Sequence, residues 1–493
     1  MQAGARQAMA LPYLAKMEVP MAKVLMVASE ANPFAKTGGL ADMVGALAAA
    51  LRAGGDQAAI VMPRYRAVSL ENVPRIYDDL RVWLGTGVWY RAAVYRAVAG
   101  EVSYYFIDCP LLYDRDGIYG DAAGDFPDNY LRFAALCQAA LGVVRSIDRP
   151  EVLHCHDWQA ALVPVYLHTR FSADPTFLGL KTLLTIHNLG YQGSYPKEVL
   201  PQLGLEGAVF APDGLGSHGQ VNLLEGGIRY SDALNAVSPT YAREIQTPEL
   251  GFGLEDLISA RSGELRGILN GVDYTEWDPE TDPYLAARYS ASDLSGKRLS
   301  KQDLLAEFGL PPENLDQPLI GIVSRFDSQK GFELIEEIAK ELAAEDFGLV
   351  ALGTSDGKYE QFFQAWAAAY PQKIAVRIAY DNRLAHKIEG GCDMFLMPSR
   401  YEPCGLNQMY SLRYGAVPIV RATGGLNDTV DEQTGFTFRE YTGQALLEAI
   451  RAALAVFRDQ DRWVAMMRRG MARDFSWGAA AAQYSALYRR LIG

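Results

Sequence analysis

Residues 22–52 read AKVLMVASEANPFAKTGGLADMVGALAAALR, and this stretch decides the fold. Its first part, Ala22–Ala28, is almost entirely apolar and has the length of a buried strand. A loop containing Gly38 and Gly39 follows, and Leu40–Arg52 has the alanine and leucine content of a helix. A strand, a glycine loop and a helix in this order open a βαβ unit. The stretch therefore predicts an α/β fold built on a mostly parallel sheet.

The same alternation continues through the first half of the chain. Further strands are expected at Ala58–Met62, Ser103–Ile107, Val152–Cys155, Leu183–Ile186 and Leu234–Val237, with helices at Tyr130–Arg145 and Gln159–Thr169. Val82–Val98 differs, because glycines interrupt a segment dense in β-forming residues. We expect it to form a hairpin at the edge of the sheet.

The pattern restarts near Gly267. Leu319–Ser324 predicts a strand and Phe332–Ala343 a helix, with more strands at Phe347–Leu352, Ile374–Ile378, Met394–Met397 and Val417–Val420. Two similar sheets imply two domains with a cleft between them. We expect the first domain at 21–266, the second at 267–477 and a final alanine-rich helix at 478–493. Residues 1–20 are expected to be a poorly ordered extension.

Composition limits the classes of function. The chain has 493 residues, of which 49% are hydrophobic and 21% charged, as in a globular protein of two or three domains. Its formal net charge of −13 argues against a nucleic-acid or anionic-membrane surface, so any anion site must be local. Five cysteines without a CxxC pair, and the lack of an apolar run of about 18 residues, predict a cytoplasmic protein without disulfides or membrane spans.

Two loops at predicted strand ends carry histidines. His154-Cys155-His156-Asp157-Trp158 ends one strand and His187-Asn188 ends another, where ligands bind in parallel sheets. Alternation along a strand places His154 and His156 on one face, so half of a metal site is possible. Hydrogen bonding of a polar ligand or a role in the core is the alternative that we prefer, and no metal is expected.

Three further loops carry charge beside glycines. Lys36-Thr37-Gly38-Gly39-Leu40 lies between a strand and a helix, where the glycines would let a diphosphate approach free N–H groups. Arg325 and Lys330 flank a second loop of the same kind and predict a second phosphate site. Glu402, in Glu402-Pro403-Cys404-Gly405-Leu406, could receive sugar hydroxyls or face a developing positive charge. Each loop alone could instead be a tight turn with solvated side chains, but together they predict a single cleft.

These motifs resemble those of the bacterial glycogen synthase and plant starch synthase family, which are retaining glucosyltransferases that use ADP-glucose. The resemblance runs from about Lys23 to Phe475. It rests on Lys36–Asp42, His156–Trp158, His187–Leu189, Val237–Ala242, Asn270–Asp273, Ser324-Arg325 with Gln329-Lys330-Gly331, and Glu402–Leu406. It implies two Rossmann-like domains of the GT-B type, with the last helix crossing back to the first domain.

The resemblance also implies roles for individual residues. Lys36, Gly38 and Gly39, with Asp42 nearby, would meet the phosphates of the donor from the first domain, and Arg325 and Lys330 would neutralise the diphosphate from the second. His187 and Asp157 would contact the transferring glucose. Glu402 and the backbone of Cys404, Gly405 and Leu406 would hold its hydroxyls, Asn270 would contact the sugar, and Tyr119 would belong to the lining. No metal or other cofactor is expected. One departure is Glu225, where the family would lead us to expect a lysine.

The reaction that the resemblance implies is transfer of glucose from ADP-glucose to the nonreducing 4-OH of an α-1,4-glucan such as glycogen, with retention of configuration. Three alternatives remain at this point. They are a transferase of the same fold that uses UDP-glucose or another sugar nucleotide, a non-catalytic glucan-binding relative, and a metal-dependent hydrolase built on His154 and His156. The sequence leaves the oligomeric state open.

Overall fold

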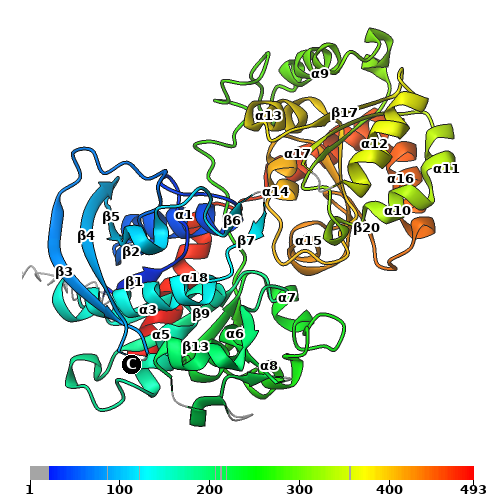
Figure 1. Cartoon of the computed structure of the whole chain (residues 1–493). Coiled ribbons are helices and arrows are strands. Elements are labelled where there is room, and N and C mark those ends of the chain that lie inside the picture. The colour runs from blue at the N-terminus through cyan, green and yellow to red at the C-terminus, as the bar shows by residue number, and fades with distance from the viewer. Residues whose placement is uncertain are drawn as a thin grey trace, which may run out of the picture.

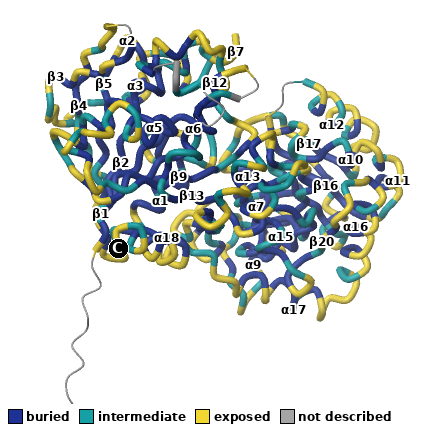
Figure 2. Tube along the Cα trace, turned by 90° about the horizontal axis from the view of Figure 1, so that it is seen from below, coloured by how far each residue is buried: buried dark blue, intermediate teal, exposed yellow. Residues whose placement is uncertain are grey.

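The computed structural model describes residues 21–85, 87–121, 123–205, 207–210, 214–217, 219–354 and 357–493. It consists of two lobes joined at one side (Figure 1). Residues 1–20, for which we expected a poorly ordered extension, lie outside the described residues. Buried residues form a separate centre in each lobe, as Figure 2 shows, so each domain has its own hydrophobic core. The chain is α/β, as predicted.

The first domain contains a nine-stranded sheet in the order β14-β13-β9-β8-β1-β2-β5-β4-β3. Its strands are β1 (Lys23–Val27), β2 (Gln57–Pro63), β3 (Arg75–Trp83), β4 (Trp89–Ala99), β5 (Val102–Asp108), β8 (Val152–His156), β9 (Lys181–Ile186), β13 (Ala233–Ala236) and β14 (Leu265–Gly267). All neighbouring pairs are parallel except those made by β4. Strand β1 is central and buried because helices cover both faces of the sheet.

Helices of the first domain connect successive strands. They include α1 (Gly39–Ala53), α3 (Asn129–Ser146), α4 (Asp157–Ala160), α5 (Leu162–His168), α6 (Leu223–Tyr230), α7 (Pro239–Glu244) and α8 (Glu255–Ala260). Because the parallel strands end at one edge, the loops that follow β1, β8 and β9 lie together there. These are the loops that hold Lys36, Asp157 and His187.

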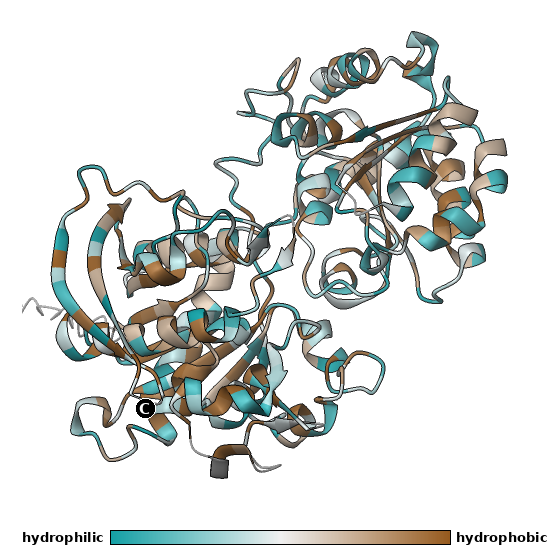
Figure 3. Cartoon of the chain, viewed as in Figure 1, coloured by the Kyte–Doolittle hydropathy of each residue, from teal (hydrophilic) through white to brown (hydrophobic). Residues whose placement is uncertain are grey.

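The second domain contains six parallel strands in the order β17-β16-β15-β18-β19-β20. The strands are β15 (Leu319–Val323), β16 (Gly348–Gly353), β17 (Ile374–Ile378), β18 (Met394–Met397), β19 (Val417–Arg421) and β20 (Phe436–Phe438). The surrounding helices are α9 (Ser295–Phe308), α10 (Phe332–Glu337), α11 (Ala339–Ala344), α12 (Lys358–Ala369), α13 (Asn382–Gly391), α14 (Asn407–Arg413), α15 (Gly424–Thr429), α16 (Gly443–Phe457) and α17 (Gln460–Met471). Figure 3 shows the apolar strands of both domains enclosed by helices with hydrophilic outer faces.

The chain passes between the domains twice, at two neighbouring places. It leaves the first domain after β14, and it returns before α18 (Trp477–Ile492), which lies among elements of the first domain (Figure 1). The crossings touch, because Val272 N donates to Phe475 O at 2.7 Å and Phe475 N donates to the Tyr274 hydroxyl at 2.9 Å. Gly271 permits this approach, since a Cβ there would lie 2.6 Å from Trp477 Cα.

The predicted elements differ from the structure in three places. The edge hairpin exists, but its first strand begins at Arg75. The prediction missed this start because residues 75–79 are mostly exposed and only Leu80 and Val82 of the strand are buried, so it lacks the continuous apolar run that marks the central strands. The helix predicted at Gln159–Thr169 is divided at Ala161, because Pro164 has no N–H to donate to the carbonyl of residue 160. The helix predicted at Phe332–Ala343 is divided at Ile338, and nothing in the structure explains this break.

Helix α18 is fastened to the first domain by buried tyrosines. The Tyr488 hydroxyl lies 2.8 Å from His154 Nδ1, and the Tyr484 hydroxyl lies 2.7 Å from the side-chain amide of Asn235. Ser485 Oγ donates to Asp56, which also accepts from the backbone N–H of Ala22 at 2.9 Å. The last helix therefore belongs to the core of the domain with which the chain begins.

Replacement of Tyr484, which is fully buried, should destabilise the protein. We expect Tyr484→Ala to lower the free energy of unfolding by about 3–5 kcal/mol, because it opens a cavity between α18 and the sheet. Urea unfolding followed by tryptophan fluorescence measures this. Arg490→Ala, on the exposed side of the same helix, is the control and should stay within about 0.5 kcal/mol of the parent. Equal stabilities of the two variants would contradict the packing described here.

Candidate active site

A cleft of about 610 Å³ lies between the two domains, and residues of both line it. Ten of the predicted site residues are in this lining: Lys36, Gly38, Gly39, Asp42, Asn270, Arg325, Lys330, Glu402, Gly405 and Leu406. The structure thus brings together the charged loops that the sequence indicated. Four predicted residues, Tyr119, Asp157, His187 and Cys404, lie outside the lining.

The glycine loop of the first domain is held from beneath by Glu30, which the sequence reasoning missed. This buried carboxylate accepts hydrogen bonds from the backbone N–H and the hydroxyl of Thr37. Tyr119, predicted to belong to the lining, instead donates to Glu30 Oε1 at 3.0 Å from behind the loop. Burial raises the pKa of Glu30, although these hydrogen bonds favour its charged form. The only feature of the sequence that could have indicated this role is an acidic residue just after an apolar strand.

The open side of the same loop faces the cleft. Gly38 and Gly39 line the cleft, and a Cβ at either would meet no atom within 4 Å, so a ligand can approach the backbone at the start of α1 closely. Lys36 Nζ pairs with an Asp42 carboxylate oxygen at 2.8 Å. Burial alone would lower the pKa of Lys36, but the Asp42 carboxylate outweighs it and the net shift is upward. A positive charge is therefore maintained beside an accessible helix start.

The histidine loops form a buried cluster at the ends of β8 and β9. The rings of His154 and His156 lie 4.1 Å apart between centroids, so they share a face as predicted. His154 binds Thr185 and Tyr488, which gives it a role in the core, and His156 Nδ1 lies 3.1 Å from His187 Nε2. Among the described residues, no group of three or more His, Cys, Asp or Glu side chains could hold a metal ion.

Asp157 directly follows this strand in an unusual backbone conformation, with φ of 55°. Its carboxylate accepts the backbone N–H of His187 at 2.7 Å, which joins the two loops. Burial raises the pKa of Asp157 to about 7, while N–H groups of His187 and Asn188 oppose the shift. Burial also lowers the pKa of His187 to about 3, so its imidazole is neutral at physiological pH.

The second domain contributes a paired cation and carboxylate. Lys330 Nζ lies 2.7 Å from Glu402 Oε2, and Ser399 Oγ donates to the same oxygen at 3.0 Å. Both side chains are largely buried, with exposures of 17% and 8%. Gly331 has φ of 74° and lets the Lys330 loop approach the end of strand β18. A Cβ on Gly331 would lie only 2.0 Å from Pro398 O, so a larger residue would not fit. The Arg325 side chain is more exposed than that of Lys330, and its guanidinium nitrogen Nη2 lies 3.4 Å from Asp327 Oδ2.

After Glu402, the loop continues along the cleft, where Gly405 and Leu406 line it. Gly405 has φ of 71°, and a Cβ there would lie 2.5 Å from Gln408 Oε1, so the turn requires glycine. The Cys404 side chain is buried beneath, and burial raises the pKa of its thiol to about 12. Asn270, from the crossing between domains, has a buried Oδ1 without a hydrogen-bond partner within the described parts of the chain. This oxygen can accept from a ligand hydroxyl.

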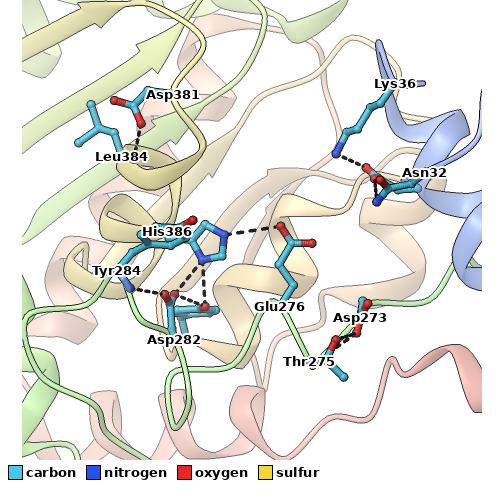
Figure 4. Close-up of polar contacts among 12 residues, drawn as sticks. Asn32, Lys36, Asp273, Thr275, Glu276, Asp282, Tyr284, Asp381, Leu384 and His386 are labelled. Atoms are coloured by element: carbon cyan, nitrogen blue, oxygen red, sulfur yellow. Dashed lines mark hydrogen bonds and ion pairs between the residues drawn. The ribbon is translucent and has the colours of Figure 1, made fainter. Parts of the chain in front are cut away.

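A further wall of the cleft, absent from the predictions, comes from the crossing segment after Asn270. Trp277 lies between His386 and Tyr410, with ring centroids 3.7 and 4.0 Å away and nearly parallel planes. His386 Nδ1 lies 2.8 Å from Asp282, and Glu276 lies 4.0 Å from its other nitrogen (Figure 4). This stack fixes the crossing segment against α13 and α14.

Comparisons with known proteins agree with this geometry. Residues 23–260 match the family model of the starch synthase catalytic domain, and residues 307–468 match that of glycosyl transferases group 1. The chain is 49% identical over 474 residues to the glycogen synthase of Koribacter versatilis, covering 95% of this chain and 98% of that protein. It is 46% identical over 477 residues to the glycogen synthase of Anaeromyxobacter dehalogenans, covering 95% and 99%. The chain belongs to the glycogen synthase and starch synthase family.

Solved structures extend this result. The catalytic domain of Starch Synthase IV from Arabidopsis thaliana, bound to ADP and acarbose, has a TM-score of 0.87 and 32% identity, and the match covers 96% of this chain and 100% of that one. A sucrose-phosphate synthase from Thermosynechococcus elongatus, at a TM-score of 0.61 and 19% identity, shares the fold. The predicted GT-B architecture is confirmed.

Membership of the family also confirms the predicted activity. The enzyme is a glucosyltransferase of glycogen synthesis, with ADP-glucose as donor, and neither the UDP-glucose alternative nor the non-catalytic alternative is favoured. Glu225, the one departure noted in the sequence, is buried on α6 outside the cleft lining and pairs with Arg229 at 2.8 Å. Within the described residues, no helix has both the length and the apolar character to span a membrane.

Ionisation of Asp157 should appear in the pH dependence of turnover. Because burial raises its pKa to about 7, the carboxyl is neutral at lower pH and becomes charged as the pH rises through 7. If Asp157 lies beside the reacting sugar, as the resemblance implies, its negative charge stabilises positive charge in the transition state, and kcat should rise over this range. Asp157→Asn keeps an oxygen that can accept the His187 N–H, but it should lower kcat and remove the rise. An unchanged pH profile in this variant would contradict the assignment.

Loss of Lys330 should slow the chemical step. We expect Lys330→Ala to lower kcat by about 10²–10³-fold, because it removes the cation predicted to stabilise the leaving group and leaves Glu402 without its partner. Steady-state kinetics with ADP-glucose and glycogen measure this. Lys358→Ala, whose lysine pairs with Glu336 on the surface, is the control. A raised KM with unchanged kcat would show that Lys330 only binds the donor.

Proposed function

We propose how this glucosyltransferase holds its donor. The diphosphate of ADP-glucose lies between the start of α1 with Lys36 on one side and Arg325 with Lys330 on the other. The glucose lies beyond it, against the Glu402 loop and Asn270. The observation that carries this proposal is the single cleft into which both domains direct these groups.

The first-domain loops complete the sugar site. Asp157 and His187 lie outside the cleft lining, but the hydrogen bond from the His187 backbone N–H to the Asp157 carboxylate fixes both at the sheet edge that faces the second domain. His187, neutral and bonded to His156, can offer a hydrogen bond to a sugar hydroxyl without adding charge. Asp157 places a carboxylate near the carbon that becomes positive during transfer.

We propose that transfer occurs on one face of the sugar. The bond between glucose C1 and the phosphate oxygen breaks, and a new bond forms from C1 to the 4-OH oxygen of the acceptor on the same face. The acceptor proton passes to an oxygen of the departing diphosphate, so the products are ADP and a glucan longer by one glucose with retained configuration. Lys330 and Arg325 stabilise the negative charge on ADP as the bond breaks.

In this proposal the reaction needs no metal or other cofactor, because Arg325 and Lys330 of the second domain and Lys36 of the first balance the negative charge of the diphosphate. The acceptor is the nonreducing end of an α-1,4-glucan such as glycogen. The solved relative bound to ADP and acarbose supports a nucleotide and a glucan-like ligand as occupants of this kind of cleft. We place the reaction in the cytoplasm, where the five cysteines, all unpaired and buried, stay reduced.

Incorporation of label tests the proposal. Purified protein with glycogen primer should transfer ¹⁴C-glucose from ADP-glucose into polymer at an undiminished rate in excess EDTA. UDP-glucose in the same assay should give a lower rate. A requirement for added divalent metal would contradict the mechanism, and a preference for UDP-glucose would contradict the donor. Digestion of the product by β-amylase, which attacks α-1,4 linkages from nonreducing ends, tests the linkage and the retained configuration.

A further inference from the structure

Two short helices join the domains beside the Glu402 loop. Helix α7 belongs to the first domain and α15 to the second, and they lie next to each other in Figure 1. The beginning of α7 contacts the end of α15, and the end of α7 contacts the beginning of α15. The two helices therefore run in opposite directions across the domain boundary.

Each domain supplies a carboxylate to the helix of the other. Asp428, on α15, accepts from the backbone N–H and the hydroxyl of Thr240, both at 2.7 Å. Glu244, on α7, accepts from the backbone N–H of Gly424 at 3.1 and 3.0 Å and from the Thr423 hydroxyl at 2.9 Å. The result is a reciprocal clamp made of directional hydrogen bonds to charged groups, which are stronger than neutral ones.

The clamp is continuous with the Glu402 loop. Gly425 N donates to Glu402 O at 3.1 Å, directly after the glycine that Glu244 binds. The backbones pack closely here, since a Cβ on Gly424 would lie 1.8 Å from Glu402 O and one on Gly425 would lie 1.9 Å from Cys404 O. Ser238, just before α7, donates to Pro403 O at 2.7 Å. The first domain thus reaches the backbone of this loop directly and through α15.

We propose that Glu244 is a positioning residue for glucosyl transfer. By binding Gly424 it fixes α15, and through Gly425 it fixes the backbone that carries Glu402 relative to the first domain. The inference rests on the proposed function, because Glu402 and the first-domain loops with Asp157 and His187 must meet the same sugar. Groups on two separately folded domains need such a fixed reference, since a misplacement of about 1 Å can cost about 100-fold in rate.

Kinetics of three variants test the role of Glu244. Glu244→Ala should lower kcat by about 10- to 100-fold, while the dissociation constant for ADP, measured by calorimetry, changes less than about 3-fold because Lys36 and the start of α1 are untouched. Glu244→Gln keeps one oxygen to accept the Gly424 N–H and should recover most of kcat. Glu249→Ala removes an exposed carboxylate five residues further along and should match the parent.

Hydrogen exchange provides a readout that does not depend on the reaction. In Glu244→Ala, the backbone N–H of Gly425 should exchange faster than in the parent, and in Glu249→Ala it should not. Unchanged exchange at residues 402–425, or unchanged kcat, would overturn the positioning role. Equal losses of kcat, ADP binding and thermal stability in the Ala and Gln variants would also overturn it, because that pattern indicates general unfolding. If the parent protein transfers no glucose from ADP-glucose, the proposed function fails, and the exchange result still decides the role of Glu244.

Discussion

The cleft must balance the negative charge of a diphosphate inside a protein that is itself acidic, and its arrangement depends on this constraint. The chain has a net charge of −13, so the cations that meet the donor must be local and must be stable before the donor binds. In the structure each of them has a carboxylate neighbour: Lys36 has Asp42, Lys330 has Glu402 and Arg325 has Asp327. A buried lysine without such a neighbour would be costly or would lose its proton. In the proposed donor site, the phosphates therefore meet cations that carboxylates already hold in position.

The division of these pairs between two domains explains the rest of the architecture. Lys36 and Asp42 follow β1 of the first sheet, and Lys330 and Glu402 follow β15 and β18 of the second. Neither sheet alone surrounds the donor. The domains are connected by two chain crossings, which touch at Val272 and Phe475, and by the contact between α7 and α15. Both connections lie beside the cleft, since Asn270 and Trp477 of the crossings line it and α15 is bonded to the Glu402 loop, so they keep the two halves of the cleft aligned.

Much of this arrangement follows from sequence because buried parallel strands leave a clear pattern. The strands at Ile374–Ile378 and Met394–Met397 were predicted with their observed bounds, since an apolar run ends where the polar loop begins. The edge strand β3 was misjudged because only one of its faces is buried. Its alternation of Leu80 and Val82 with exposed residues resembles a loop more than a central strand.

The supporting residues were harder to predict than those at the loops. Glu30 lies in the first domain near Thr37, but its role follows from the path of the backbone, which composition and spacing do not show. Glu244 and Gly424 are about 180 residues apart in sequence, so no local pattern connects them. Tyr119 was predicted to lie in the lining, yet it supports Glu30 from behind. The contacts of Glu30 become visible only when the first domain is folded, and the contact between Glu244 and Gly424 only when the two domains are docked.

The polar groups of the cleft also indicate how it selects a sugar. Asn270 Oδ1 is buried without a partner among the described residues, and Gly38 and Gly39 leave the backbone at the start of α1 open to close approach by a ligand. Leaving a buried oxygen such as Asn270 Oδ1 unpaired costs about 1–3 kcal/mol, and a hydroxylated ligand removes that cost. A site built to bind hydroxyls rejects analogues that lack them far better than an apolar pocket can distinguish sizes. Selection of glucose therefore depends on the same polar surface that holds the donor in place, and the apolar stack of Trp277 with His386 and Tyr410 supplies the rigid wall behind it.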